Sequence, residues 1–210
     1  MFQKTTLDNG LRIVTGTMPH THSVCIAIFI GVGSRYETDK EAGTSHFLEH
    51  MCFRGTTLRP AARDISEAIE GVGGILNGAT DKELTCYWCK VTKAHFSHAS
   101  EVLVDMLMNS KFEIGDLERE RQVICEEISM CKDSPSQQVG MLIDELLWPD
   151  HPLGRDIAGT RETVGCLERS SMLDFMKRKY IPANTVITVA GDVENNEVLN
   201  IFQKLLGLAQ

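Results

Sequence analysis

Two histidines and a glutamate in one short stretch are spaced to bind a metal ion and to use it. The stretch is His46-Phe47-Leu48-Glu49-His50, and it lies inside residues 42–56. If that run is helical, His46 and His50 lie one turn apart on the same face. Two imidazole rings in this arrangement can bind one Zn²⁺. Glu49 faces the same space, where it is better placed to hold a water beside the metal than to be a ligand.

A third protein ligand is needed, because catalytic zinc sites combine three protein ligands with one open position. A predicted helix over residues 116–132, which Asp116 can cap, carries the candidates. These are Glu118, Glu120, Glu126 and Glu127. Glu120 and Glu127 are seven residues apart, so they share one face of that helix.

Glu127 is the favoured third ligand. At helical spacing its neighbours are Val123, Ile124, Met130 and Cys131. This apolar surrounding predicts that Glu127 points into the core, whereas Glu126 takes a rim position. A carboxylate in an apolar environment is costly unless it is paired or bound to a metal. We therefore expect Glu127 to complete the ligand set and Glu120 to be a second inward carboxylate.

Two less specific interpretations stay open at this point. The histidines could belong to a buried helix and bond to neighbouring groups rather than to a metal. The glutamates could form ion pairs within their own helix, because Arg119 and Arg121 are close by.

Composition narrows the range of partners. The chain has 210 residues and a formal net charge of −8, which disfavours nucleic acid and anionic membranes as partners. Its length is enough for one domain or two small ones with a hydrophobic core. The longest apolar run, residues 24–32, is too short to cross a bilayer.

The cysteines indicate a reducing compartment. There are seven, an odd and scattered set that does not resemble a disulfide framework. Cys86 and Cys89 form a C-x-x-C on a predicted strand, where residues three apart point to opposite faces. Because no signal peptide is evident at the N-terminus either, we expect a cytoplasmic protein.

Strands and helices of ordinary length are predicted around these residues. The Asn9-Gly10 turn predicts a hairpin near the N-terminus. Further strands are expected over residues 11–17, 23–32, 75–79, 83–91 and 185–190. Helices are expected over residues 60–72, 94–110, 135–147, 161–167, 170–179 and 195–206. The strands are too irregularly placed for a βαβ alternation, so the pattern predicts an α+β domain with a mostly antiparallel sheet packed with helices.

The combined motifs resemble the insulinase/pitrilysin family of zinc peptidases, which includes the mitochondrial processing peptidases. In that family the inverted H-x-x-E-H motif is followed after a long spacing by a third ligand, which matches Glu127. Another functional glutamate stands seven residues before that ligand and matches Glu120. Other matching segments are residues 7–11, 33–37, 73–87, 151–155 and 184–191. One departure is Gly78, because the family usually has Ala after the Asn at Asn77.

The resemblance implies a fold and a domain arrangement. The fold would be a metallohydrolase domain like that of the mitochondrial processing peptidase. Residues 1–210 would form one zinc-bearing N-terminal domain, without the second domain of the family. A homodimer, or a partner subunit that carries the second domain, would then complete the active assembly.

The resemblance also implies roles for the site residues. Zn²⁺ would be bound by His46, His50 and Glu127. The catalytic glutamates would be Glu49 as general base and Glu120 as a group that orients His50 or the substrate. The strand at Asn77, Gly78 and Ala79 would bind a peptide substrate by backbone pairing.

The expected function is that of a zinc-dependent endopeptidase that activates water with Glu49 as general base. Two alternatives are a non-catalytic peptide-binding or scaffold subunit of a processing-peptidase-like complex, and a zinc hydrolase acting on a small molecule.

Overall fold

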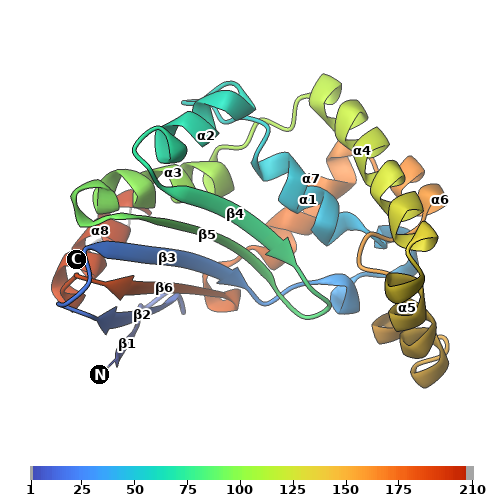
Figure 1. Cartoon of the computed structure of the whole chain (residues 1–210), viewed down its shortest axis with the longest axis horizontal. Helices are drawn as coiled ribbons and strands as arrows, with labels where there is room; N and C mark the ends of the chain where they lie inside the picture. Colours follow the sequence, from blue (N-terminus) through green and yellow to red (C-terminus); the bar gives the residue numbers. More distant parts are fainter. Residues whose placement is uncertain (1, 207–210) are drawn as a thin grey trace.

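A six-stranded sheet forms the centre of the computed structural model, which describes residues 2–206 (Figure 1). The strands are β1 (Phe2–Thr6), β2 (Arg12–Thr17), β3 (Ser23–Ile30), β4 (Ile75–Thr80), β5 (Thr85–Thr92) and β6 (Thr185–Gly191). Their order is β1-β2-β6-β3-β5-β4, so β4 is an edge strand. Only β2 and β6 pair in parallel, and the other four pairs are antiparallel. This confirms the predicted α+β class with a mostly antiparallel sheet.

The described helices lie around this sheet. They are α1 (Thr44–Cys52), α2 (Ala62–Glu70), α3 (Phe96–Met108), α4 (Ile114–Asp133), α5 (Pro135–Leu147), α6 (Arg161–Cys166), α7 (Arg169–Lys179) and α8 (Asn195–Leu205). Short 3-10 helices occur at Ser34–Tyr36, Asp39–Glu41, Lys93–His95, Pro152–Gly154 and Pro182–Asn184. Among residues 2–206, no helix combines the length and the apolarity that a bilayer crossing requires.

The core lies between one face of the sheet and helices α3 and α8. These helices contact β2, β3 and β5, and they lie behind the sheet in Figure 1. Alternate strand residues point into this layer, and Ile13, Ile26, Tyr87 and Val189 are all buried. Burial of such side chains drives the packing of the layer. The edge strand β4 is attached to this packed layer through its pairing with β5.

Helix α1 lies at the β4 side of the sheet, where it contacts β4, β5, α4 and α7. Helices α4 and α5 follow one another along the right side of Figure 1, away from the sheet. The site residues on α1 and α4 therefore face each other next to the edge strand.

Element boundaries differ from the predicted ones in two informative places. The helix expected within residues 42–56 covers Thr44–Cys52, because Gly43 and Gly55 take left-handed φ angles of 94° and 145°. Helix α4 begins at Ile114 with Glu113 as its N-cap, so the prediction that Asp116 caps it was wrong. Asp116 instead lies in the first turn and pairs with Arg119.

Candidate metal centre

A buried carboxylate fixes the start of the histidine helix. Glu37 is only 4% exposed. Its carboxylate accepts hydrogen bonds from the Gly43 N–H (2.8 Å) and the Ser45 N–H (2.6 Å). These donors belong to the helix start, where backbone N–H groups have no partner within the helix. A negative charge at this end is also favoured by the helix dipole. Glu37 thus determines where α1 begins and how it is oriented.

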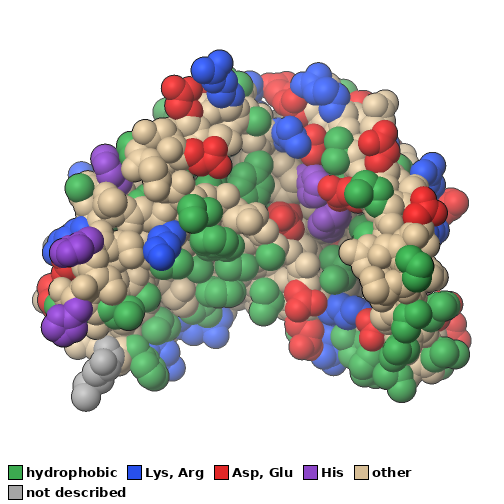
Figure 2. Space-filling view, viewed as in Figure 1, with side chains coloured by type: hydrophobic (Ala, Val, Ile, Leu, Met, Phe, Trp, Pro, Cys, Tyr) green, Lys and Arg blue, Asp and Glu red, His purple; other side chains and the backbone are tan. Residues whose placement is uncertain are grey.

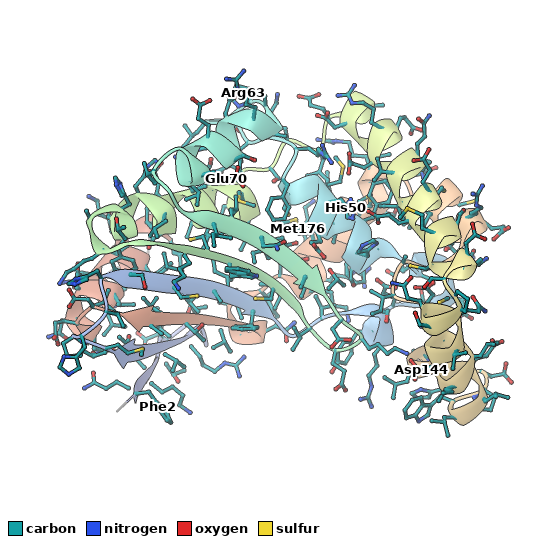
Figure 3. All side chains as sticks on the ribbon, in the orientation of Figure 1. Phe2, His50, Arg63, Glu70, Asp144 and Met176 are labelled. Carbon is teal, nitrogen blue, oxygen red and sulfur yellow. The ribbon has the colours of Figure 1, made fainter. Side chains whose placement is uncertain are left out.

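His46 and His50 lie side by side on α1 and face Glu127 on α4. The His46 Nε2 and His50 Nε2 atoms are 3.2 Å apart. Glu127 Oε2 lies 3.8 Å from His46 Nε2 and 3.6 Å from His50 Nε2. In Figure 2 histidine side chains line the hollow between the sheet and the helices on the right, and Figure 3 labels His50 there. Among residues 2–206, this is the one group of His, Cys, Asp and Glu compact enough to hold a metal ion.

The spacing of these three atoms fits a tetrahedral ion. Metal–ligand bonds of about 2.0–2.1 Å in tetrahedral geometry place neighbouring ligand atoms about 3.4 Å apart. The observed separations of 3.2, 3.6 and 3.8 Å bracket that value. Two imidazole nitrogens and one carboxylate oxygen are also a donor set that zinc prefers.

Glu120 orients His50 from behind. His50 Nδ1 donates to Glu120 Oε2 at 3.0 Å, and Arg54 Nη2 lies 2.8 Å from the same oxygen. With its Nδ1 proton held by Glu120, neutral His50 presents an unprotonated Nε2 towards Glu127 and His46. Arg54 compensates the charge of a Glu120 side chain that is only 3% exposed.

Burial and neighbouring charges separate the pKa values of the two histidines. Burial, together with the nearby His50, lowers the pKa of His46 to about 4. Burial alone would also lower the pKa of His50, but the hydrogen bond to Glu120 and the charge of Glu127 raise it above its ordinary value. The same contact with His50, with help from Arg54, lowers the pKa of Glu120 despite its burial. His46 is therefore a neutral imidazole, and a candidate metal ligand, over the whole physiological range.

Glu49, the predicted base, lies between the two histidines in sequence and contacts the edge strand. Its side chain lies between α1 and β4, where Glu49 Oε2 accepts a hydrogen bond from Thr80 Oγ1 at 2.5 Å. Burial raises the pKa of Glu49, and the Thr80 bond and His50 only partly offset this. A carboxylate of raised pKa is a stronger proton acceptor.

The predicted substrate strand is the free edge of the sheet next to these groups. Asn77 and Ala79 of β4 are exposed, whereas Gly78 is half-buried and faces Glu49. The Gly78 N–H donates to Asn77 Oδ1 at 2.8 Å. Backbone groups on this edge are therefore available to pair with an extended peptide.

One of the two burial predictions was wrong. Glu127, expected to point into the core, is 42% exposed at its side chain, whereas Glu120 is the buried carboxylate. The two do share one face of α4, as the spacing predicts. The neighbours of Glu127 misled the prediction, because Val123 and Met130 are themselves exposed, at 38% and 69%.

Sequence reasoning missed three contributors to the site, namely Glu37, Arg54 and Thr80. Arg54 and Thr80 contact groups far away along the chain, so no local spacing pointed to them. Glu37 contacts the start of the next helix, six and eight positions on, and no helical or strand periodicity links these residues. Glu37 and Thr80 do lie within segments that resemble the peptidase family, and that resemblance was the available signal. For Arg54 the only signal in the sequence was its position four residues after His50.

The fold and the ligand geometry define a class of α+β proteins with a single-ion metal centre beside an edge strand. Residues 12–161 match the family model described as insulinase (peptidase family M16). The chain belongs to this peptidase family, as its motifs indicated.

Similar proteins agree with this assignment. An uncharacterized zinc protease of Mycobacterium leprae is 39% identical over 204 residues, which cover 97% of this chain and 46% of the relative. The uncharacterized zinc protease YmxG of Bacillus subtilis is 40% identical over 201 residues, covering 96% and 49%.

Solved structures share the fold. A protease from Helicobacter pylori has a TM-score of 0.92 at 24% identity and covers 97% of this chain and 49% of its own. The periplasmic protease PqqL from Escherichia coli has a TM-score of 0.88 at 26% identity, and the match covers 98% of this chain and 23% of PqqL. The chain spans about half the length of the curated relatives it matches, which are the zinc proteases of M. leprae and B. subtilis.

Proposed function

We propose that the chain is the zinc-bearing part of an endopeptidase that hydrolyses peptides. The observation that carries this proposal is the placement of His46, His50 and Glu127 around one point. Glu49 lies on the same helix as the two histidines and is hydrogen-bonded to Thr80 of the edge strand β4. The matched relatives, which are named zinc proteases, support zinc as the metal.

In this proposal His46 Nε2, His50 Nε2 and a Glu127 oxygen hold the ion. Bound zinc would polarise the scissile carbonyl and lower the pKa of a water molecule towards neutrality. Glu49 accepts a proton from that water and later gives it to the leaving amine as the C–N bond breaks. Glu120 keeps the His50 ring in place through its Nδ1 proton.

The substrate is an extended peptide that adds to the free edge of β4. Residues Asn77, Gly78 and Ala79 would pair with its backbone, which holds the scissile bond beside Glu49. The Asn77 side chain would leave the Gly78 N–H, so that this donor can bind a peptide carbonyl. Backbone pairing of this kind imposes little sequence preference.

A second unit would complete the active assembly. Because the chain spans about half the length of the matched relatives, we propose that residues 1–210 are the first, zinc-bearing domain. The family's second domain would complete the site, whether it belongs to the same protein or to a partner subunit, and a homodimer is the other possible arrangement.

A cytoplasmic location is part of the same proposal. All seven cysteines are free in the structure, which suits a reducing compartment.

The proposal is tested by cleavage of a quenched fluorescent peptide, with zinc content measured on the same sample. We expect activity that a chelator removes and that added zinc restores. A chain that binds zinc and peptide but cleaves nothing, alone or with a separately made second half of a relative, would favour the binding subunit.

A further inference from the structure

The carboxylate of Glu49 is held from the side of the sheet by a single hydroxyl. Thr80 Oγ1 donates to Glu49 Oε2 at 2.5 Å, and among the described residues no other side chain or backbone group donates to this carboxylate. The bond joins the last residue of β4 to the middle of α1, which are 31 positions apart in the chain. A short bond to an ionised acceptor belongs to the stronger hydrogen bonds of proteins.

The backbone of β4 lies directly against the same side chain. A Cβ added at Gly78 would lie 3.0 Å from Glu49 Oε1 and 2.9 Å from Phe53 Cε2. Gly78 and Thr80 are two residues apart, so they face the same side of the strand. The absence of a side chain at Gly78 therefore leaves room for Glu49, while Thr80 determines where its carboxylate points.

We propose that Thr80 is a positioning residue for Glu49, and that β4 thereby couples substrate binding to the placement of the base. This inference rests on the proposed peptidase function. Thr80 holds Oε2, while Oε1 lies beside Gly78 of the same strand. The free edge of the same strand would pair with the peptide, so one element aligns the scissile bond and the proton acceptor.

The consequence for catalysis follows from geometry. A carboxylate that loses its only donor can rotate about its side-chain bonds, and small misplacements of a reacting group reduce the rate strongly. Peptide pairing with the strand backbone does not involve the hydroxyl, so substrate affinity should stay the same. Among the described residues, Thr80 forms no hydrogen bond with the candidate ligands His46, His50 and Glu127, so zinc binding should stay the same as well.

The test compares two variants. Thr80→Val removes the hydroxyl but keeps the shape of the side chain, whereas Thr80→Ser keeps the hydroxyl and removes the methyl group. Thr92→Val, an exposed threonine on the neighbouring strand β5, is the matched control. We expect Thr80→Val to lower kcat for a quenched peptide about 10- to 100-fold. KM should change less than about twofold and the zinc content should not change. Thr80→Ser should recover most of the activity, and Thr92→Val should behave like the wild type.

Crystal structures of the zinc-loaded wild type and Thr80→Val provide a readout that does not depend on turnover. We expect the Glu49 carboxylate to be turned away from its wild-type position in the variant. An unchanged Glu49 together with an unchanged kcat would overturn the proposal. If the wild-type chain cleaves no peptide, the proposed function fails separately, and the position of Glu49 in the two crystal structures alone decides the role of Thr80.

Discussion

The chemical form of the residues in the metal centre is determined by neighbouring groups and by burial. His50 presents its Nε2 because Glu120 holds the Nδ1 proton, and Glu120 stays ionised in the interior because Arg54 lies 2.8 Å away. His46 stays neutral because burial lowers its pKa to about 4. These supporting groups are as much a part of the site as the three candidate ligands.

Because the Glu127 side chain is 42% exposed, it can be substituted without disturbing the core, and its proposed role as a ligand can be tested directly. We expect Glu127→Gln to weaken zinc binding about 100-fold or more, because the site loses its one anionic ligand. Glu126→Gln, a change of the adjacent exposed residue on the same helix, is the matched control and should bind zinc like the wild type. Competition with a chromogenic chelator measures both. Equal affinities of the two variants would rule out Glu127 as a ligand.

Zinc affinity should depend on pH through one histidine only. The pKa of His50 is raised, so its proton competes with the metal already near neutral pH, whereas the pKa of His46 is about 4. Affinity should therefore fall about tenfold for each pH unit between roughly pH 6 and pH 5. Titration calorimetry in buffers across this range gives the slope. A hundredfold fall per unit would mean that both histidines lose protons on binding.

At the scale of elements, local patterns predicted the helices and strands well. The helix with His46 and His50, the common face of Glu120 and Glu127 and the strand over residues 75–80 all follow from spacing and turn residues. Burial across elements could not be predicted in this way. Whether Glu120 or Glu127 is buried depends on how α4 packs against α1. The residue pattern of a single helix does not predict that packing.

The attachment of α1 depends on Glu37, a contact between segments that local patterns do not encode. We expect Glu37→Ala to lower the free energy of unfolding by about 2–4 kcal/mol, because it leaves the buried Gly43 and Ser45 N–H groups without their acceptor. Urea unfolding measures this change. Glu70→Ala, at the exposed end of α2, is the control and should change the value by less than about 0.5 kcal/mol. Similar losses in both variants would contradict the anchoring role of Glu37.

At the scale of the whole molecule, apolar surface remains exposed in the described chain, as expected for one part of a larger assembly. Helix α5 has no buried residue, and an apolar stripe on it is at least 45% exposed. The stripe consists of Val139, Leu142, Ile143, Leu146 and Leu147. Continuous apolar surface of this kind is uncommon on proteins that act alone.

We therefore expect the chain to associate, either with itself or with a second domain. Light scattering over a wide concentration range should show a mass that rises towards a dimer, or a stable complex after addition of the unmatched half of a relative such as YmxG. A chain that stays monomeric at high concentration and does not bind the added half would contradict the proposed assembly.

Glu49 is the proposed base of a zinc-dependent peptidase. The most direct test of this role is the Glu49→Gln variant, in which peptide cleavage and zinc content are measured on the same preparation. We predict that zinc stays bound, because Glu49 is not a ligand, while cleavage falls by about 10²- to 10⁴-fold. Wild-type cleavage by a Glu49→Gln protein that still carries its zinc would contradict the claim.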